Sequence, residues 1–322
     1  MDFDAVRSLL RGPGALISTI FHEDFSLDDE AIERNIRSMF DRGFGKGGGF
    51  LIAPCGDGEY TTLTPEENAR VVAAAVRGSD GSVPVVAGVQ SFDYRLAAHT
   101  AEGARRAGAV AVMMAPPVYY TLNDEAIVDW YERFGRTVDI GIMLYEQAWR
   151  GPVVNAGIRP DLVGRLLDIP SVVAMKHVGL FHLPDVFAIL DRYHDRFAYI
   201  DSTACYAMTV GHMHGAAGYT SEMAPVWPEH EMRYWHLLEA GSYREAELHR
   251  SKITPLHQLF SAHPSTTSAF SWVSVLKAAL EYVGLTGGPV RPPFRALDGA
   301  ERREVFQALE AFGVPTAQPA GV

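Results

Sequence analysis

Residues 83–115 read VPVVAGVQSFDYRLAAHTAEGARRAGAVAVMMA: an apolar run, a turn, an amphipathic stretch and a second apolar run. Both runs are continuously apolar rather than alternating between apolar and polar residues. That pattern is typical of parallel strands covered on both faces. Two parallel strands need a crossover between them, usually a helix. The stretch therefore predicts one strand–helix–strand unit.

The same unit recurs along most of the chain. Apolar runs lie at residues 15–21, 48–54, 83–89, 109–115, 140–145, 171–176, 197–201 and 216–221. Eight strand–helix units in about 220 residues fit a closed barrel better than an open doubly wound sheet. The Rossmann alternative needs a glycine-rich turn after its first strand, but residues 45–49 (GKGGG) precede a strand. We therefore predict the α/β class, as a (β/α)8 TIM barrel.

Several segments between the runs carry helix start signals. Residues 26–29 (SLDD) and 64–67 (TPEE) resemble capping boxes, and the second has proline at the first helical position. Asn123 precedes two acids, which suit the first turn of a helix. These signals predict helices between successive strands.

The alternation stops after residue 226. Residues 227–260, 268–283 and 299–312 are predicted to be mainly helical. The expected organisation has three parts: the catalytic barrel at 1–225, a C-terminal helical extension of the same domain at 226–314, and a tail at 315–322.

Composition excludes several classes of function. The chain has 322 residues, 48% of them apolar and 21% charged, which is the balance of a soluble globular protein. Its net charge of −11 argues against nucleic acid or an anionic membrane as a partner. The two cysteines have no metal-type spacing, and neither a secretory signal nor a membrane-spanning run is present. We expect a cytoplasmic protein whose partner is a small molecule.

Lys176 is the most informative residue for chemistry. Active sites of such barrels lie at the C-terminal ends of the strands, and Lys176 ends the apolar run VVAM. Burial lowers the pKa of a lysine, which frees its neutral amine to attack a carbonyl group. The iminium so formed accepts electrons when a neighbouring bond breaks. The alternative is a strand-end lysine that reaches solvent.

Four further polar positions follow strands. Tyr145 could shuttle protons and Tyr120 could relay them, although both are also compatible with plain packing. The turn at 56–59 (GDGE) offers backbone N–H groups that could hold a carboxylate, and Arg150 could be a second anion partner. A simple turn and a surface arginine are the alternatives.

Other candidates are less specific. His212 and His214 would point to different faces of a helix, so we do not expect a metal there. Cys55 is interpreted as a small buried residue rather than a nucleophile. Polar residues after strands five, seven and eight are candidates for contacts with the distal part of a substrate: Glu146, Gln147, Ser202, Thr203 and Ser221.

An ordered set of motifs resembles the dihydrodipicolinate synthase / N-acetylneuraminate lyase family. The likeness runs from about residue 14 to residue 313. It comprises GALISTIFHEDFSLD, CGDGEYTTLTPEE, VPVVAGV, GAVAVMMAPPVYY, IMLYEQ, VVAMKH, AAGYTSEMAPVWP and GGPVRPPFRAL, in that order. The ordered set is specific, although no single motif is.

This resemblance implies roles for individual residues. It makes Lys176 the imine-forming lysine, Tyr145 the proton-shuttling tyrosine and Tyr120 the second tyrosine of a proline-tyrosine-tyrosine loop. Further residues would bind the substrate carboxylate: Gly56, Asp57 and Arg150. The resemblance also suggests a homo-oligomer, a tetramer or dimer, and no metal or organic cofactor, because the imine itself is the electron sink.

The chain departs from the family pattern at three places. Gly56-Asp57 stands where the synthase branch has two threonines, so an inward Asp57 would repel a substrate carboxylate. Glu146 follows Tyr145 where asparagine is usual, and His177 follows the lysine where an acid is common. Gly56 and Tyr60 look closer to the 5-dehydro-4-deoxyglucarate dehydratase branch.

Three hypotheses follow. The leading one is a Schiff-base lyase that dehydrates a sugar-derived or similar 2-oxo acid. The second is a pyruvate-dependent aldolase or a condensing enzyme like 4-hydroxy-tetrahydrodipicolinate synthase. The third is a relative that binds a ligand without turnover.

Overall fold

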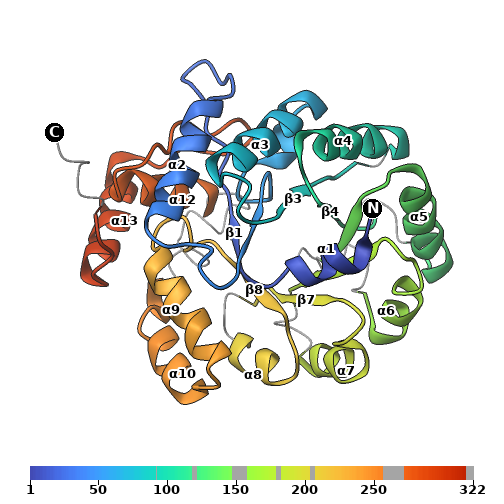
Figure 1. Ribbon diagram of the computed structural model, residues 1–322. Helices are drawn as coiled ribbons and strands as arrows, with labels where there is room; N and C mark the ends of the chain where they lie inside the picture. The colour runs from blue at the N-terminus through green and yellow to red at the C-terminus, as the bar shows by residue number, and fades with distance from the viewer. Residues whose placement is uncertain are drawn as a thin grey trace.

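The computed structural model describes most of the chain. The described residues are 1–91, 93–117, 122–146, 158–178, 183–203, 207–256 and 272–316. Figure 1 shows a central barrel of strands surrounded by a ring of helices.

Eight parallel strands close into one barrel in sequence order, with β1 paired to both β2 and β8. The strands are β1 (Gly12–Leu16), β2 (Phe50–Ile52), β3 (Val85–Gly88), β4 (Ala111–Met114), β5 (Gly141–Glu146), β6 (Val172–His177), β7 (Ala198–Asp201) and β8 (Gly218–Ser221). The predicted TIM barrel is confirmed.

Helices connect the strands and continue after the last one. Those of the barrel are α1 (Phe3–Leu9), α2 (Asp29–Asp41), α3 (Pro65–Gly78), α4 (Tyr94–Ala107), α5 (Asp124–Thr137), α6 (Pro160–Leu166), α7 (Leu183–Tyr193) and α8 (Met208–Met213). Those that follow β8 are α9 (Pro228–Glu239), α10 (Tyr243–Ser251), α12 (Trp272–Tyr282) and α13 (Gly299–Ala311). A short 3₁₀ helix, η1 (Tyr60–Thr62), precedes α3.

The first strand differs from its prediction. β1 ends at Leu16, whereas the apolar run continues to residue 21. Beyond the strand the chain folds back on itself, and Phe21 forms an isolated antiparallel bridge with Leu27. The N–H of Ile17 still donates to the carbonyl of Ile52 on β2, and residues 18–21 are buried by loop packing rather than by strand pairing, which a local apolar pattern cannot distinguish.

Two of the predicted helix starts are confirmed and one is shifted. Thr64 and Glu67 form a reciprocal capping box at α3, and Asn123 caps α5 through the N–H of Ala126. The cap of α2 is Asp28, whose carboxylate accepts from the N–H of Ala31, and not Ser26. Aspartate is as good a cap as serine, so the sequence offered two candidates.

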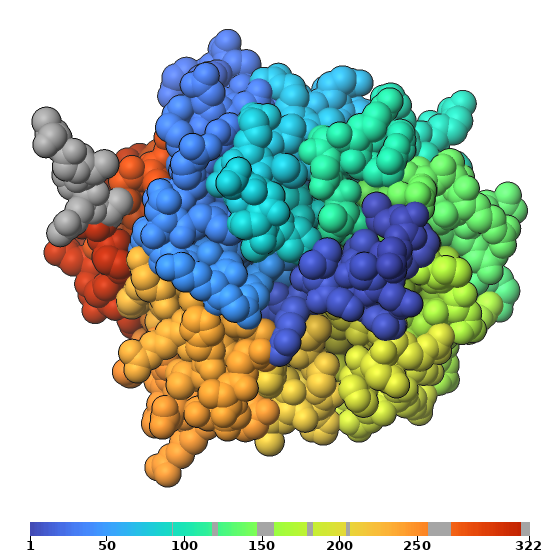
Figure 2. Space-filling view, in the orientation of Figure 1, coloured from blue at the N-terminus to red at the C-terminus, as the bar shows by residue number. Residues whose placement is uncertain are grey.

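Buried side chains fill the barrel interior at the N-terminal end of the strands. Gly14 leaves room for the ring of Phe50, because a β-carbon at Gly14 would lie 2.4 Å from that ring. Val6 and Leu10, from α1 and just after it, belong to the same buried cluster. Figure 2 shows the N-terminal segment lying across the middle of the face turned to the viewer.

That face carries the N-terminal ends of the strands. Arg7 donates to the carbonyl of Arg196, and the N–H of Gly12 donates to the carbonyl of Ala217. Both carbonyls lie just before a strand, β7 and β8 respectively. The interior is thus closed at this end, and a site must open at the other.

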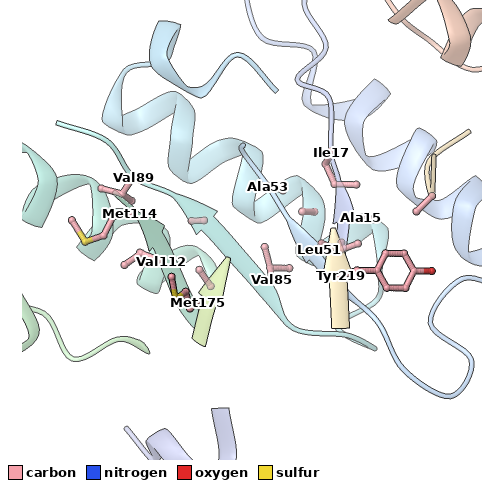
Figure 3. Close-up of a cluster of buried hydrophobic side chains, with 14 of the residues drawn as sticks. Ala15, Ile17, Leu51, Ala53, Val85, Val89, Val112, Met114, Met175 and Tyr219 are labelled. Carbon is pink, nitrogen blue, oxygen red and sulfur yellow. The ribbon is translucent and has the colours of Figure 1, made fainter. Parts of the chain in front are cut away.

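A second buried cluster fills the space between barrel and helices. Figure 3 shows strand residues that alternate with the interior set, including Ala15, Leu51, Val112 and Met175. Strands covered on both faces explain why their sequences are continuously apolar. In the described residues, no helix is both long and apolar enough to cross a membrane.

Candidate active site

Two functional side chains meet at the open end of the barrel. Tyr145 on β5 is paired with Lys176 on β6 in the strand register. Tyr145 shares the interior cluster with Met143, and Ala174 of that cluster is two residues before Lys176. Because side chains alternate along a strand, both Tyr145 and Lys176 point into the barrel.

An irregularity in β6 produces this alignment. Ile142 is paired with Val172, but Met143 is paired with Ala174, so Val173 is an extra residue. Bulges of this kind change which residues of two strands lie opposite one another. The bulge sets Lys176, rather than Met175, beside Tyr145.

The amine of Lys176 is buried and close to a phenol. Lys176 is 5% exposed and Tyr145 is 6% exposed. The Nζ atom lies 4.4 Å from the centre of the Tyr145 ring. With so little of its surface exposed, Lys176 is a buried residue and not a strand-end lysine extended into solvent.

The turn after β2 is tightly hydrogen-bonded within itself. The N–H groups of Gly58 and Tyr60 donate to the carbonyl of Cys55, and that of Glu59 donates to Gly56. Glu59 adopts a left-handed backbone conformation with φ 54°. The N–H donors of residues 58–60 are therefore used inside the turn, and the expected carboxylate-binding nest, which includes Gly56 and Asp57, stays a prediction.

Asp57 faces the site rather than turning away from it. Its carboxyl lies in electrostatic range of the Lys176 amine and of Glu222, and it accepts a hydrogen bond from the indole of Trp272. Burial raises the pKa of Asp57 to about 6, Glu222 also raises it, and Lys176 opposes the increase. This carboxyl is consequently poised between its ionised and neutral forms near neutral pH.

A buried ion pair anchors that turn to the C-terminal helices. Oε1 of Glu59 lies 2.6 Å from Nζ of Lys277 on α12, and both side chains are almost completely buried. Lys277 also donates to the carbonyl of Pro289. Burial lowers the pKa of Lys277, while Glu59 acts in the opposite direction. The pair fixes α12, which begins at Trp272, against the turn that carries Asp57.

A second anchor lies beside the first. Arg291 donates its backbone N–H to Glu59 and makes a two-point ion pair with Glu67. Its guanidinium also lies 4.1 Å from the ring of Phe21. Glu59 and Glu67 are two of the four acids of the segment CGDGEYTTLTPEE, and both bind cations of the C-terminal region.

Glu146 and His177 lie on the outer face of the barrel wall. They follow the inward Tyr145 and Lys176, and their side chains come within 3.8 Å of one another. Nδ1 of His177 is 2.8 Å from the hydroxyl of Tyr199. These groups form a buried polar layer behind the site, so a direct contact of Glu146 with substrate is not favoured.

The polar residues at the ends of β7 and β8 also divide into those that face the barrel interior and those that face away from it. The hydroxyl of Ser202 lies 2.8 Å from that of Thr220, on the side of the barrel interior. Ser221 is fully buried, and its hydroxyl accepts from the N–H of Ala224. Thr203 donates to Asp201. Ser221 and Thr203 thus have local structural partners, and contact of Ser221 with a substrate stays a prediction.

Some predicted residues lie outside the described part of the chain. They are Tyr120, Gln147, Arg150 and Cys205. Their expected roles stay predictions.

Sequence reasoning missed three contributors to the site: Trp272, Glu222 and Lys277. The first and third lie on a helix more than two hundred residues after Asp57 and Glu59, and no local pattern links them. Glu222 directly follows a predicted strand, so its strand-end position was the signal that could have found it.

The structure gives no support to metal or thiol chemistry in the described residues. His212 pairs with Glu239 and His214 with Asp191. Among the residues described, no group of three His, Cys, Asp or Glu side chains is arranged to hold a metal ion. Cys55 is fully buried, and burial raises the pKa of its thiol to about 12, so it is a poor nucleophile.

The fold and the site together define a class of protein. It is the class of TIM barrels that carry a buried lysine, next to a tyrosine, inside the C-terminal end of the barrel. Within that class, the chain belongs to the dihydrodipicolinate synthetase family, whose model matches residues 10–312.

Curated relatives place the chain among lyases of this family. It is 29% identical to the 4-hydroxy-tetrahydrodipicolinate synthase of Methanoculleus marisnigri, over 92% of this chain and 97% of the relative. It is 28% identical to an uncharacterized DapA-like lyase of Halobacterium salinarum, over 95% of both chains. It is 27% identical to a probable 5-dehydro-4-deoxyglucarate dehydratase of a Bradyrhizobium species, over 91% of this chain and 90% of the relative.

Solved structures share the fold. The dihydrodipicolinate synthase of Acinetobacter baumannii, solved in complex with pyruvate, superposes with a TM-score of 0.81 at 23% identity and covers 95% of this chain and 100% of its own. A monomeric dihydrodipicolinate synthase variant superposes with a TM-score of 0.83 at 21% identity, over 96% and 99% of the two chains.

Proposed function

We propose that this protein is a lyase that acts on a 2-oxo acid through a Schiff base on Lys176. The observation that carries the proposal is the position of the Lys176 amine, buried inside the open end of the barrel beside the Tyr145 ring. The neutral form of such an amine is the nucleophile that adds to a ketone.

The reaction follows from these two side chains. The neutral amine adds to the ketone carbon, and the resulting carbinolamine loses water to become an iminium ion. The iminium accepts the electron pair of a bond to the neighbouring carbon. If that bond is carbon–carbon, the chain is cleaved; if it is carbon–hydrogen, the resulting enamine expels a hydroxyl group, as water, from the next carbon. Tyr145 donates and accepts the protons of these steps. The imine is the electron sink, so this scheme requires no metal or organic cofactor.

The proposed branch is dehydration of a sugar-derived or similar 2-oxo acid, as in 5-dehydro-4-deoxyglucarate dehydratase. The likeness of Gly56 and Tyr60 to that branch supports it, and relatives named as probable dehydratases are nearly as similar as the synthase. The alternative is a pyruvate-dependent aldolase or a condensing enzyme like 4-hydroxy-tetrahydrodipicolinate synthase. Product analysis separates them, because a dehydratase releases water without cutting or extending the carbon chain.

Reductive trapping tests the Schiff base. The protein is incubated with pyruvate or with 2-keto-3-deoxy sugar acids, reduced with borohydride and weighed by mass spectrometry. We expect the mass to increase by one reduced ligand and peptide mapping to locate it on Lys176. Lys176→Arg, which keeps the charge but cannot form the imine, should give no adduct.

Two results would contradict the proposal. One is an unmodified mass with every 2-oxo acid of the panel, and the other is an adduct that persists in Lys176→Arg. Tight binding of a 2-oxo acid without a reducible adduct would instead identify a binding protein without turnover.

We further propose a cytoplasmic homo-oligomer, a tetramer or dimer. The family resemblance supports the oligomer, and the two cysteines, too few for a disulfide framework, support a reducing compartment. Because a monomeric synthase variant with the same fold exists, the assembly has to be measured, for example by sedimentation equilibrium.

A further inference from the structure

The carboxylate of a 2-oxo acid needs hydrogen-bond donors at the site, and part of the turn after β2 is not free to supply them. The N–H groups of Gly58, Glu59 and Tyr60 are already bonded inside the turn. An ionised substrate placed there without donors would lose its hydration and gain little in return. The following inference rests on the proposed function and concerns how that carboxylate is held.

The space for a carboxylate lies beside Gly56. A β-carbon at Gly56 would meet no atom within 4 Å, so the volume next to it is open. Asp57 is the next residue and is partly buried. A ligand group in this open volume would lie next to the backbone that carries Asp57.

Charged and titratable groups surround Asp57 on several elements. Lys176 faces it from β6, Glu222 from the end of β8, and the Cys55 thiol lies 4.0 Å from its Oδ2. The neutral indole of Trp272 donates to it from α12. An ionised Asp57 together with Glu222 and a substrate carboxylate would place three negative charges around one lysine.

Protonation of Asp57 removes one of these three negative charges. A neutral carboxyl group carries an O–H that can donate to the substrate carboxylate, and it adds no charge. Burial and the nearby Glu222 both raise the pKa of Asp57, to about 6, so protonation near neutral pH is inexpensive.

We propose that Asp57 binds the carboxylate of the 2-oxo acid as the neutral acid, donating its O–H to a substrate oxygen. When Asp57 is ionised before binding, the complex takes up one proton from solvent with each substrate molecule. No covalent bond changes in this step.

The proposal fixes the sign of the pH dependence. Binding through the neutral acid is strongest below the pKa of Asp57 and weakens as pH rises above it. Between pH 6 and pH 8 the neutral fraction of a group with pKa about 6 falls by about 50-fold. Affinity for the carboxylate should fall by the same factor.

The experiment compares two ketones of similar size. Pyruvate carries a carboxylate, and hydroxyacetone has a CH2OH group in its place. Borohydride trapping at a series of concentrations gives the half-saturation of each at each pH. Both ketones form an imine with the same amine, so the titration of Lys176 cancels in the ratio of the two values. We expect the preference for pyruvate to fall about 50-fold between pH 6 and pH 8.

Asp57→Asn is the matched variant, because asparagine has the same shape and donates an N–H at every pH. Its preference for pyruvate should not change with pH and should exceed that of the unmodified protein at pH 8 by about tenfold or more. Glu222→Gln is a second variant, independent of the first. It removes a negative neighbour, so the fall in preference should move to lower pH.

The outcomes distinguish the role proposed for Asp57 from the Schiff base proposed for Lys176. A preference that stays flat from pH 6 to pH 8, or that rises, overturns the role of Asp57 while an adduct on Lys176 still supports the Schiff base. A fall with pH that persists in Asp57→Asn also overturns it. No adduct with either ketone removes the Schiff base, and this inference with it.

Discussion

Individual residues at the barrel mouth divide into those that face the chamber and those that face away. Lys176 and Tyr145 point inward, whereas the next residue of each strand, His177 and Glu146, forms a buried polar layer behind the wall. The alternation of a strand is the cause. The departure from the family pattern at Glu146 and His177 therefore affects the support of the site more than its contact surface.

Tyr145→Phe tests proton transfer at this scale. The variant keeps the ring against Lys176 and removes only the hydroxyl, so folding and substrate affinity should change little. Loss of a general acid–base group should lower kcat by about 10²- to 10⁴-fold with a much smaller change in KM. Steady-state kinetics on the substrate found by trapping measure both.

Tyr94→Phe is the control, because the Tyr94 hydroxyl bonds to the carbonyl of Arg133 between outer helices. Equal losses of kcat in both variants would show that the effect at Tyr145 is structural and not catalytic.

At the scale of elements, the turn after β2 and helix α12 act as one unit. Glu59 and Lys277 join them through a buried ion pair, and Trp272 at the start of α12 donates to Asp57. The helical extension thus supplies part of the candidate site. The division of the chain at residues 225 and 226 stays a prediction about organisation, and these contacts agree with a single domain.

Glu59→Gln tests the ion pair. The substitution leaves the Lys277 charge buried without its partner, which should lower the free energy of unfolding by about 3–5 kcal/mol. The double variant Glu59→Gln with Lys277→Met buries no charge and should be more stable than Glu59→Gln alone. Urea denaturation followed by circular dichroism measures all three proteins.

Glu30→Gln is the control for the same change of side chain, since Glu30 pairs with Arg34 on an exposed helix surface. It should cost about 0.5 kcal/mol or less. A double variant less stable than Glu59→Gln would mean that the pair is not the source of the loss.

At the scale of the whole molecule, the residues that close the barrel interior and the residues of the candidate site lie at opposite ends of the barrel. Helix α1 lies across the N-terminal end of the barrel (Figure 1), and Leu10 fills the interior there. Lys176 lies near the C-terminal end of β6, and Asp57 lies in the turn after β2. Such separation allows either end to change without the other.

Leu10→Ala tests this separation. Leu10 is completely buried, so the cavity should lower the free energy of unfolding by about 2–5 kcal/mol. At a temperature where the variant stays folded, kcat should be unchanged, because the cavity lies at the far end from Lys176. Thermal unfolding and kinetics at that temperature measure the two effects.

The neighbouring Leu9 provides the control, because it is 52% exposed. Leu9→Ala should change the free energy of unfolding by about 0.5 kcal/mol or less. A kcat that falls in Leu10→Ala as steeply as its stability would contradict the separation of the two ends.

The sequence by itself determined the barrel and its principal candidate nucleophile. Parallel strands covered on both faces are continuously apolar, and a polar residue that ends such a strand lies at the open end of the barrel. Lys176 and Tyr145 could therefore be identified from the local sequence pattern. Only the tertiary structure decided which residues complete the site. The bulge at Val173 and the contacts of Asp57 with Trp272 and Glu222 depend on register and on packing between distant segments, which leave no periodic signal in a single chain.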